Sequence, residues 1–537
     1  MTAARSVFLS ALSGLLLVLS WPVDGLWILL FVALIPLLWV EDAVSQKGNK
    51  VHPQFFMLAV FSALIWNIGT TWWIYNASLG GAAMAIIANS LLMGFIWYLA
   101  HVSRVKTKHP LGIWTLVFYW MAFETIHYEW DIMWPWLNLG NGLAGHEKLI
   151  QWFEFTGLQG GSLWILVLNL MLFDTLKKCK EKGPALKPFL KPALVLLIPV
   201  LISLGIFYSY QEQGKAIRTI LLQPNIDPYT EKFNGIPAEE QLQIMLRMAS
   251  QAGLDTADLL VGPETALVGN IWENELETDE AILKLRSFLQ SYPRLNLLMG
   301  ASTAYLYQPG EKLSETARQS MRGERWWDSY NTGLMIQSGK PVQLYHKSKL
   351  VPGVEKMPWP FLFKYIESFA IDLGGSSGSL GVQPEPGNFQ LLDSNEKVAP
   401  IICYESVFPE YVSEYVKKGA SLLAIITNDG WWGDTPGYRQ HLSFGAMRAI
   451  ETRRSIVRSA NTGISCFINQ RGEIILPTSW WVPATQSGIV YANHRETFFV
   501  KFGNVLGKTA CGISVLLLLG TLYFSLKGGE KNLNSQS

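Results

Sequence analysis

A cysteine stands where an apolar, strand-like run gives way to a helical pattern, at Cys403. The run 399–402 is buried in character and stops at the thiol, and a helix-spaced apolar pattern with Pro409 in its first turn follows. N–H groups at a helix N-terminus favour a thiolate and can receive an oxyanion. Because a lone cysteine is more often a small buried hydrophobe, Cys403 is a candidate nucleophile that needs partners elsewhere in the chain.

Two charged side chains follow short apolar runs in the same way. Glu264 closes the segment 258–264, and Lys347 closes the segment 342–347. Because the carboxyl ends of strands in an α/β sheet meet at one crevice, a thiol, a carboxylate and an amine can converge there. The carboxylate can take the thiol proton, and the ammonium can help a backbone N–H to hold the oxyanion of a tetrahedral intermediate. Each charge alone would be an ordinary strand-end charge, but together with Cys403 they predict a catalytic site.

These three segments resemble the Glu-Lys-Cys motifs of the nitrilase superfamily, and the chain as a whole resembles its membrane-bound branch, the apolipoprotein N-acyltransferases. The supporting motifs are 263–266, 330–332, 350–355, 403–405, 428–433, 440–441 and 458–463. The similarity covers about 217–495 by motif and the remainder by membrane layout. It implies a nitrilase-like αββα sandwich, with Glu264 as general base, Lys347 as oxyanion stabiliser and Cys403 as nucleophile.

The resemblance also implies supporting residues around these three. They are Glu355, Glu405, Tyr404 and Asn331. Lys349 stands where the family pattern carries His, so it is an alternative to Lys347, although the spacing from Tyr345 favours Lys347. The family usually has Phe-Gly before the loop glutamate, whereas this chain has Gly353-Val354 with unchanged spacing to Glu355. We therefore expect the same role for that glutamate on a loop of different conformation.

Aromatic residues near the predicted site are candidates for substrate binding. Trp431 and Trp432 have glycines on both sides, which suggests an exposed loop, and tryptophan prefers the membrane–water boundary. Met357 and Trp359 belong to the long, aromatic-rich segment 353–388, which is interpreted either as a lid that guides acyl chains or as a loop over its own small core. Four polar residues are interpreted as structural or as supporting hydrogen bonders: His441, Arg448, Arg458 and Asn461.

Composition indicates a membrane protein independently of these motifs. Of 537 residues, 49% are hydrophobic and only 16% are charged, which exceeds the apolar content of an ordinary soluble enzyme. The net charge of +1 argues against nucleic-acid binding. The four cysteines, at positions 179, 403, 466 and 511, have neither paired nor metal-ligand spacing. The sequence has no Gly-rich phosphate loop or ligand cluster either, so neither a metal nor a nucleotide cofactor is implied.

Eight apolar stretches are candidates to cross a bilayer, which takes about 20 residues. They lie at 7–22, 24–40, 54–76, 80–102, 111–128, 154–175, 192–210 and 502–526. A second stretch follows the first almost immediately and no small-residue cleavage site separates them, so the first is interpreted as a retained helix rather than a signal peptide.

Charge in the connecting loops predicts the orientation of these spans. Lysine and arginine follow the second, fourth, sixth and last stretches, whereas the loops after the first, third and fifth are nearly free of both. By the positive-inside rule, both termini are cytoplasmic and the large domain faces outward. The sequence thus predicts a transmembrane domain of seven spans at 1–210, an outward catalytic domain at 211–501, and a last helix with a short tail at 502–537. In a bacterium this is a multi-pass inner-membrane protein whose catalytic domain faces the periplasm.

The segment between the seventh and last spans is typical of an α/β domain. Strands are expected at 217–222, 259–261, 297–301, 334–336, 422–426 and 465–468, and helices at 238–252 and 280–292. The resemblance implies that the enzyme transfers an acyl chain from a phospholipid, through a thioester on Cys403, to the N-terminal amine of diacylglyceryl-modified apolipoproteins. A membrane-tethered amidohydrolase that releases the acyl group to water is the alternative enzyme, and a non-catalytic lipoprotein-binding scaffold is a third hypothesis.

Overall fold

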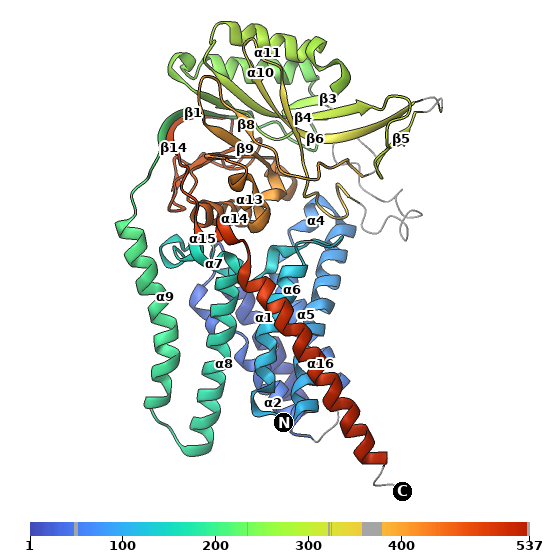
Figure 1. Cartoon of the computed structure of the whole chain (residues 1–537), viewed down its shortest axis with the longest axis vertical. Coiled ribbons are helices and arrows are strands. Elements are labelled where there is room, and N and C mark those ends of the chain that lie inside the picture. Colours follow the sequence, from blue (N-terminus) through green and yellow to red (C-terminus); the bar gives the residue numbers. More distant parts are fainter. Residues whose placement is uncertain (48–51, 234, 321–322, 324, 357–378, 534–537) are drawn as a thin grey trace. The chain divides into compact units, whose positions relative to one another are not determined.

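The computed structural model describes residues 1–47, 52–233, 235–320, 323, 325–356 and 379–533 (Figure 1). The chain divides into two compact units. A helical unit contains Met1–Tyr75, Ala82–Tyr208 and Asn504–Ser537, and a second unit contains Asn76–Gly81 and Ser209–Gly503. The second unit holds the predicted catalytic residues and is called the catalytic unit for that reason. Each unit therefore has its own packing, and each is described separately below.

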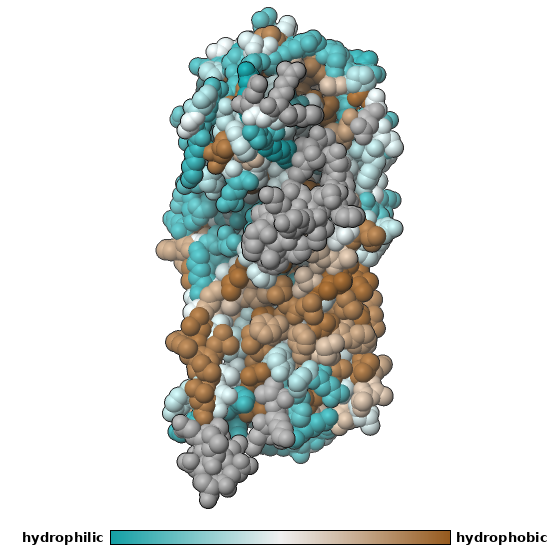
Figure 2. Space-filling model, turned by 90° about the vertical axis from the view of Figure 1, so that its right-hand side faces the viewer, coloured by the Kyte–Doolittle hydropathy of each residue, from teal (hydrophilic) through white to brown (hydrophobic). Residues whose placement is uncertain are grey.

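The helical unit consists of long apolar helices. They are α1 (Ala3–Ser20), α2 (Ile35–Ser45), α3 (Pro53–Thr71), α5 (Leu79–Thr107), α6 (Thr115–Ile126), α8 (Leu158–Lys182), α9 (Leu190–Ser209) and α16 (Val505–Leu533), with the short α4 (Ile74–Ala77) between α3 and α5 and the short α7 (Phe153–Thr156) before α8. Seven helices in the described part of the chain are long and apolar enough to span a membrane. Figure 2 shows hydrophobic side chains gathered over this unit, and Leu516, Leu519 and Leu522 of α16 are examples that lie more than half exposed. The predicted polytopic membrane architecture is confirmed.

The stretch expected to span at 111–128 forms a shorter helix. A 3₁₀ turn at Pro110–Trp114 takes up its first residues, and α6 then has 12 residues. This helix is packed against α16 over much of its length. An apolar run thus gives the composition of a segment and not the residue at which its α-helix begins.

The second expected span is interrupted rather than continuous. A 3₁₀ turn at Trp27–Phe31 precedes α2, and the break leaves backbone groups without helical partners. Asn169 of α8 supplies these missing partners. Its side-chain oxygen accepts from the Leu34 N–H at 2.9 Å, and its side-chain amide donates to the Leu30 carbonyl at 2.8 Å. Non-helical backbone is tolerated at membrane depth only where such partners satisfy it.

Basic residues predicted to mark cytoplasmic loops take part in ion pairs at helix ends. Arg104 of α5 bridges Glu41 and Asp42 of α2, and Lys177 of α8 lies 2.7 Å from Asp42. His101 of α5 lies 2.9 Å from Glu41. The basic residues on which the predicted orientation depends therefore also join the ends of three helices.

The catalytic unit contains two β-sheets. The larger has the order β14-β1-β2-β4-β6-β5, with β3 paired to β4 and β7 to β6, and the smaller has the order β13-β12-β11-β10-β9-β8. The larger sheet comprises β1 (Lys215–Gln223), β2 (Leu259–Val261), β3 (Leu267–Trp272), β4 (Asn296–Leu306), β5 (Arg318–Gln319), β6 (Trp326–Gln337), β7 (Gln343–His346) and β14 (Ala484–Ala492). The smaller comprises β8 (Phe389–Gln390), β9 (Lys397–Ile402), β10 (Leu422–Thr427), β11 (Ile456–Ala460), β12 (Cys466–Ile468) and β13 (Ile474–Ile475).

Helices cover the outer faces of both sheets, which makes four layers. The helices are α10 (Ala238–Ser250), α11 (Glu280–Gln290), α13 (Pro409–Lys417), α14 (Pro436–Thr452) and α15 (Phe498–Phe502). Figure 1 shows α10 and α11 over the larger sheet, and their apolar faces form one core with it. A second core lies between the two sheets and extends to α13 and α14. The αββα sandwich is confirmed.

The strands that are buried on both faces explain the short continuous apolar runs in the sequence. In β2, Leu259 and Val261 point into the core between the sheets, and Leu260 points into the core under α10 and α11. Alternate side chains of one strand thus enter different cores, so every position is apolar. Five of the six expected strands lie within observed ones, and the sixth, at 465–468, begins one residue before β12. Strands β4 and β6 extend well beyond the expected limits.

The ends of three strands bring the predicted site residues to one edge of the sandwich. Glu264 follows β2, Lys347 follows β7 and Cys403 follows β9. Strand β7 is antiparallel to β6, which is antiparallel to β4, so β7 runs parallel with β2. Glu264 and Lys347 therefore belong to the larger sheet, and Cys403 approaches from the smaller one.

Gly300 provides a test of how closely the Glu264 segment is held. A Cβ added at Gly300 would lie 2.4 Å from the Thr265 nitrogen and 2.7 Å from the Glu264 Cα, both backbone atoms. We expect Gly300→Ala to destabilise the catalytic unit by about 1–3 kcal/mol, as overpacked sites do, measured as a lower unfolding temperature. The matched control is Gly333→Ala, directly opposite in the β4–β6 pairing, where the nearest atom would lie at an ordinary 3.4 Å. Equal stability of the two variants would contradict this prediction.

Candidate active site

A buried ammonium between two carboxylates forms the centre of the candidate site. Lys347 Nζ donates to Glu355 Oε1 at 2.8 Å and to Glu264 Oε1 at 3.2 Å, and only 1% of the Lys347 residue is exposed. Burial acts to lower the pKa of Lys347, but the charges of Glu264 and Glu355 outweigh it and hold this pKa well above its ordinary value. Lys347 is therefore a permanent cation at the site.

Asn331 joins the same two carboxylates from the neighbouring strand β6. Its amide donates to Glu264 Oε1 at 2.8 Å and to Glu355 Oε1 at 3.3 Å, and its backbone carbonyl accepts from the Lys347 N–H at 2.8 Å. Asn331 thus fixes both the backbone position of Lys347 and the orientation of its partners.

The loop that carries Glu355 is closed on itself. The Val351 N–H donates to Glu355 Oε2 at 2.9 Å, and the Glu355 N–H donates to the Val351 carbonyl at 2.9 Å. Gly353 lies at φ +78°, a left-handed conformation that glycine adopts without steric cost. The displaced glycine in Gly353-Val354 therefore makes a different turn possible while Glu355 still reaches Lys347.

Cys403 lies at the end of β9 in a strained backbone conformation. Its φ is +50°, a region that residues with a Cβ seldom occupy and that clusters at functional sites. Burial and the Glu264 carboxylate raise the pKa of the Cys403 thiol well above its ordinary value, with Lys347 acting in the opposite sense. A 3₁₀ turn at Cys403–Val407, rather than an α-helix, follows directly. The expectation that this position favours the thiolate was wrong, because desolvation dominates.

Glu405 anchors the turn of Cys403 to the segment after Lys347. Its Oε1 accepts from the Tyr345 hydroxyl at 2.6 Å and from the Ser348 N–H at 2.7 Å, and its Oε2 accepts from the Ile402 N–H at 2.8 Å. Burial raises the pKa of Glu405 to about 7, although these hydrogen bonds act to lower it. The carboxylate therefore links the two strand ends that carry Cys403 and Lys347.

The other expected site residues lie at different distances from this centre. Tyr404 is buried with its ring edge-on to Phe408, and the Lys349 ammonium lies over the rings of Phe408 and Tyr411, so the ammonium that bridges Glu264 and Glu355 is that of Lys347. Met357 and Trp359, with most of the segment 353–388, lie outside the described residues.

Trp431 and Trp432 belong to a 3₁₀ turn at Asp429–Trp432 and are half-buried rather than exposed. The Trp431 ring stacks on Phe233 at 6.1 Å and meets Tyr229 edge-on at 5.2 Å. Trp431 is thus part of a partly open aromatic cluster, whereas the Trp432 ring meets His441 edge-on at 5.4 Å.

Lys232 is a site residue that sequence analysis missed. Its Nζ donates to the backbone carbonyl of Glu264 at 3.0 Å, and only 2% of the residue is exposed. Burial lowers the pKa of Lys232 to about 7, partly offset by the charge of Glu264. A single lysine in a polar loop has no spacing or periodicity that marks it, so only its tertiary burial reveals it.

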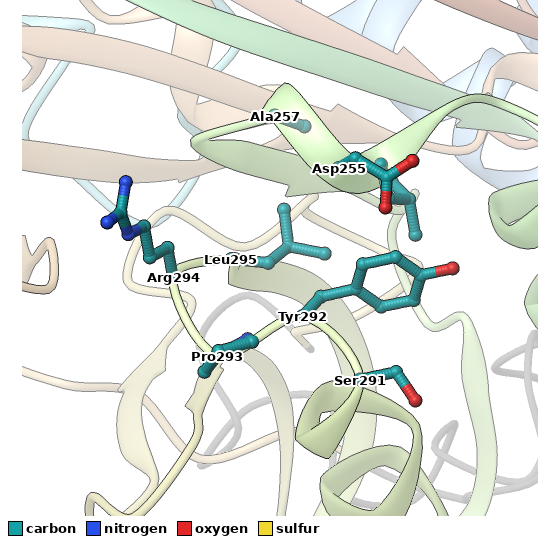
Figure 3. A pocket seen from close by; sticks show the side chains of 8 residues that line it. Asp255, Ala257, Ser291, Tyr292, Pro293, Arg294 and Leu295 are labelled. Carbon is teal, nitrogen blue, oxygen red and sulfur yellow. The ribbon is translucent and has the colours of Figure 1, made fainter.

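A separate cavity lies away from these residues. Figure 3 shows it between the turn at Leu254–Thr256 and the segment after α11, with Asp255, Tyr292 and Arg294 at its walls. Its volume is about 220 Å³, and none of the predicted site residues lines it. It contributes nothing to the candidate chemistry.

The arrangement can be compared with known families. The sequence model of the family described as "Carbon-nitrogen hydrolase" matches residues 223–493, more than half of the chain. The chain belongs to the carbon–nitrogen hydrolase family. The description "Apolipoprotein N-acyltransferase N-terminal domain" matches residues 13–171, within the helical unit. This second match separates the chain from family members that lack such a domain and identifies it as a member of the apolipoprotein N-acyltransferase branch.

Relatives of the same description extend over nearly the whole chain. An apolipoprotein N-acyltransferase of Chlorobaculum tepidum is 29% identical over 96% of this chain and 96% of its own length. One of Geobacter metallireducens is 28% identical over 93% and 92%, and one of Thermotoga maritima is 27% identical over 98% and 95%. Among solved structures, an amidase from Nesterenkonia sp. is 16% identical with a TM-score of 0.35, over 52% of this chain and 93% of its own.

The raised pKa of Glu405 predicts a pH-dependent contribution to stability. The folded state binds this proton more tightly than the unfolded state, since burial raises the pKa from 4.5 to about 7. The contribution is therefore fully present below pH 4.5 and is lost as the pH rises through 7, on the order of 3 kcal/mol in total. We expect Glu405→Gln to reduce the fall in unfolding temperature between about pH 5 and pH 7.5 relative to the unsubstituted protein. Parallel temperature–pH curves for the two proteins would contradict this account.

Proposed function

We propose that this enzyme transfers an acyl chain from a membrane phospholipid to the N-terminal amine of the diacylglyceryl-cysteine of bacterial apolipoproteins, by way of a thioester on Cys403. The observation that carries the proposal is the Lys347 ammonium held between Glu264 and Glu355 at the strand ends that also carry Cys403. The matches of both units to one group of N-acyltransferases support the same activity.

In the first half-reaction, Glu264 takes the proton of the Cys403 thiol as the sulfur attacks the ester carbonyl of the phospholipid. A carbon–sulfur bond forms, and the Lys347 ammonium stabilises the charge on the tetrahedral oxygen. When the intermediate collapses, the ester carbon–oxygen bond breaks and Glu264 returns the proton to the departing alkoxide. Glu355 and Asn331 hold Lys347 and Glu264 in place throughout, which is a positioning role.

In the second half-reaction, the amine of the lipoprotein's N-terminal cysteine attacks the thioester carbonyl. Glu264 accepts the proton that the amine loses, an amide bond forms, and the Cys403 sulfur leaves and is reprotonated. Covalent catalysis separates a lipid donor from a bulky protein acceptor, so the two need never occupy the site together. Trp431 and Trp432 are proposed contacts for the acyl chain or the acceptor.

The proposed location is the bacterial inner membrane with the catalytic unit on the periplasmic side. The alternation of Lys and Arg between loops supports this orientation. The helical unit supports substrates that reach the enzyme from the bilayer, because a soluble substrate would require no such unit.

Intact-mass measurement after incubation with phospholipid tests the donor and the nucleophile together. We expect an added acyl mass on the unsubstituted protein, removed by neutral hydroxylamine and by a diacylated lipopeptide, and no such labile adduct on Cys403→Ala or Cys403→Ser. If the protein stays unmodified and the lipid stays intact, the proposed phospholipid mechanism is contradicted. Continuous release of free fatty acid without a lipopeptide would instead favour the amidohydrolase.

A pair of lysine variants tests which ammonium stabilises the oxyanion. Lys347→Met removes the cation between the two carboxylates, so we expect acyl-enzyme formation to slow by about 10²–10³-fold, as when one oxyanion donor is lost. Lys349→Met, two residues away and over the Phe408 and Tyr411 rings, should change this rate less than tenfold. The rates are measured by quenched intact-mass time courses on protein that elutes as a single species. The opposite ranking would assign the role to Lys349.

A further inference from the structure

The main chain of Cys403 is held by side chains from outside its own strand. Its carbonyl oxygen accepts from the Ser406 hydroxyl at 2.8 Å and lies 3.0 Å from His441 Nε2, which is itself 2.9 Å from Ser406 Oγ. Neither Ser406 nor His441 has any exposed surface. Because Cys403 has a left-handed φ of +50°, a conformation that persists only where the surroundings enforce it, these two contacts act on the strained residue itself.

An ion pair orients His441 from its other side. His441 Nδ1 lies 3.0 Å from Asp429 Oδ1 and 3.1 Å from Arg458, whose guanidinium also donates to Asp429 Oδ2 at 2.7 Å. Asp429 Oδ1 also accepts from the Thr427 hydroxyl at 2.8 Å. Burial acts to raise the pKa of Asp429, yet Arg458 and His441 hold it well below its usual range. Asp429 is therefore a fixed anion, and together with Arg458 it sets the ring orientation of His441. When Arg458 donates to Nδ1, the ring carries its proton on Nε2 and can donate it to the Cys403 carbonyl.

Asp429, His441 and Ser406 follow one another in the order of a hydrolase triad, but the Ser406 hydroxyl donates to the Cys403 carbonyl and the group lacks access to substrate. Asp429 and Arg458 are at most 1% exposed, and Ser406 and His441 are fully covered. The reactive group on the same turn is Cys403, three residues before Ser406. The arrangement must therefore act through the nucleophile's backbone and not by attack of the serine.

We propose that His441, oriented by Asp429 and Arg458, is a positioning residue for acyl transfer. With Ser406 it holds the Cys403 carbonyl, keeps that backbone left-handed and so directs the sulfur towards Glu264 and Lys347. The proposal rests on the proposed role of Cys403 as the nucleophile. Trp432 meets the His441 ring edge-on at 5.4 Å, so the Asp429–Trp432 turn is also in contact with this network.

The test compares His441→Met, which has no donor, with His441→Gln, whose amide can reach the same carbonyl, in the full-length protein. We expect acyl-enzyme formation from phospholipid to slow by about 10²-fold in His441→Met, the loss typical of a misplaced reacting atom, and to recover at least tenfold in His441→Gln. The matched control is Ser443→Ala on the same helix, which removes a buried hydroxyl that bonds to the Arg439 carbonyl at 2.9 Å, and it should keep the full rate.

A double variant tests whether Ser406 and His441 act on the same carbonyl. If they do, Ser406→Ala should add less than threefold to the loss already caused by His441→Met. Losses that multiply in the double variant would overturn the shared-carbonyl arrangement.

Alkylation of Cys403 by iodoacetamide gives a readout that needs no lipid. Because the pKa of Cys403 is raised, alkylation of the unsubstituted protein should need a higher pH than alkylation of a free thiol. Burial and the charges of Glu264, Lys347 and Asp429 determine this pKa. Displacement of the sulfur in His441→Met should move the profile towards the free-thiol pKa of about 8.5. Cys466, fully buried in the same core, must stay unlabelled and so reports that the unit is still folded.

The two measurements separate the possible failures. An unchanged alkylation profile in His441→Met, or equal acylation rates for His441→Met and His441→Gln with Cys466 protected, would overturn the positioning role. If the unsubstituted protein takes up no acyl group while its alkylation profile still shifts in His441→Met, the phospholipid mechanism fails and the positioning of Cys403 stands.

Discussion

The catalytic unit depends on keeping one ammonium charged inside the protein. An isolated ion in this environment would lose several kcal/mol of hydration, so Lys347 is stable only because Glu264 and Glu355 accept its hydrogen bonds. Those two carboxylates lie far apart in sequence, one after β2 and the other on a closed loop. The need to bring them together explains why Asn331, Gly300 and Gly353 have such specific roles: each fixes a strand end or a loop against this pair.

The cysteine imposes the opposite electrostatic requirement. A cation that stabilises an oxyanion would also favour a thiolate, yet burial and Glu264 raise the pKa of the Cys403 thiol well above its ordinary value. Glu405 adds a second constraint, because it joins the turn of Cys403 to the segment after Lys347 without placing a further permanent charge next to the sulfur. The site therefore consists of a buried ammonium, a carboxylate and a thiol of raised pKa, and hydrogen bonds from side chains and from the backbone hold them in place.

Sequence reasoning locates the parts of this site that depend on local position. Glu264, Lys347 and Cys403 each end a strand-like run, and a strand end is visible in the sequence because the apolar pattern stops there. Lys232 and the network around His441 were missed or interpreted as structural, because their contacts join segments up to 38 residues apart and leave no periodicity. The direction in which the pKa of Cys403 shifts could not be predicted either. The start of a helix can be recognised in the local sequence, whereas desolvation of the thiol depends on residues distant in the sequence. For the same reason the apolar run 111–128 gave no sign that its α-helix begins only at Thr115.

In the proposed mechanism, a thiol of raised pKa suits an enzyme that must wait first for a lipid donor and then for a protein acceptor. Thiolates, not thiols, react with oxidants and alkylating agents, so a raised pKa protects Cys403 between turnovers. The cost is that the proton must leave during attack, and a carboxylate already linked to Lys347 and Asn331 is placed to accept it. Deprotonation is then coupled to the arrival of a carbonyl whose developing negative charge Lys347 stabilises. Such coupling demands an accurately placed sulfur, and this is the reason that the backbone of Cys403, and not only its side chain, is held by buried polar groups.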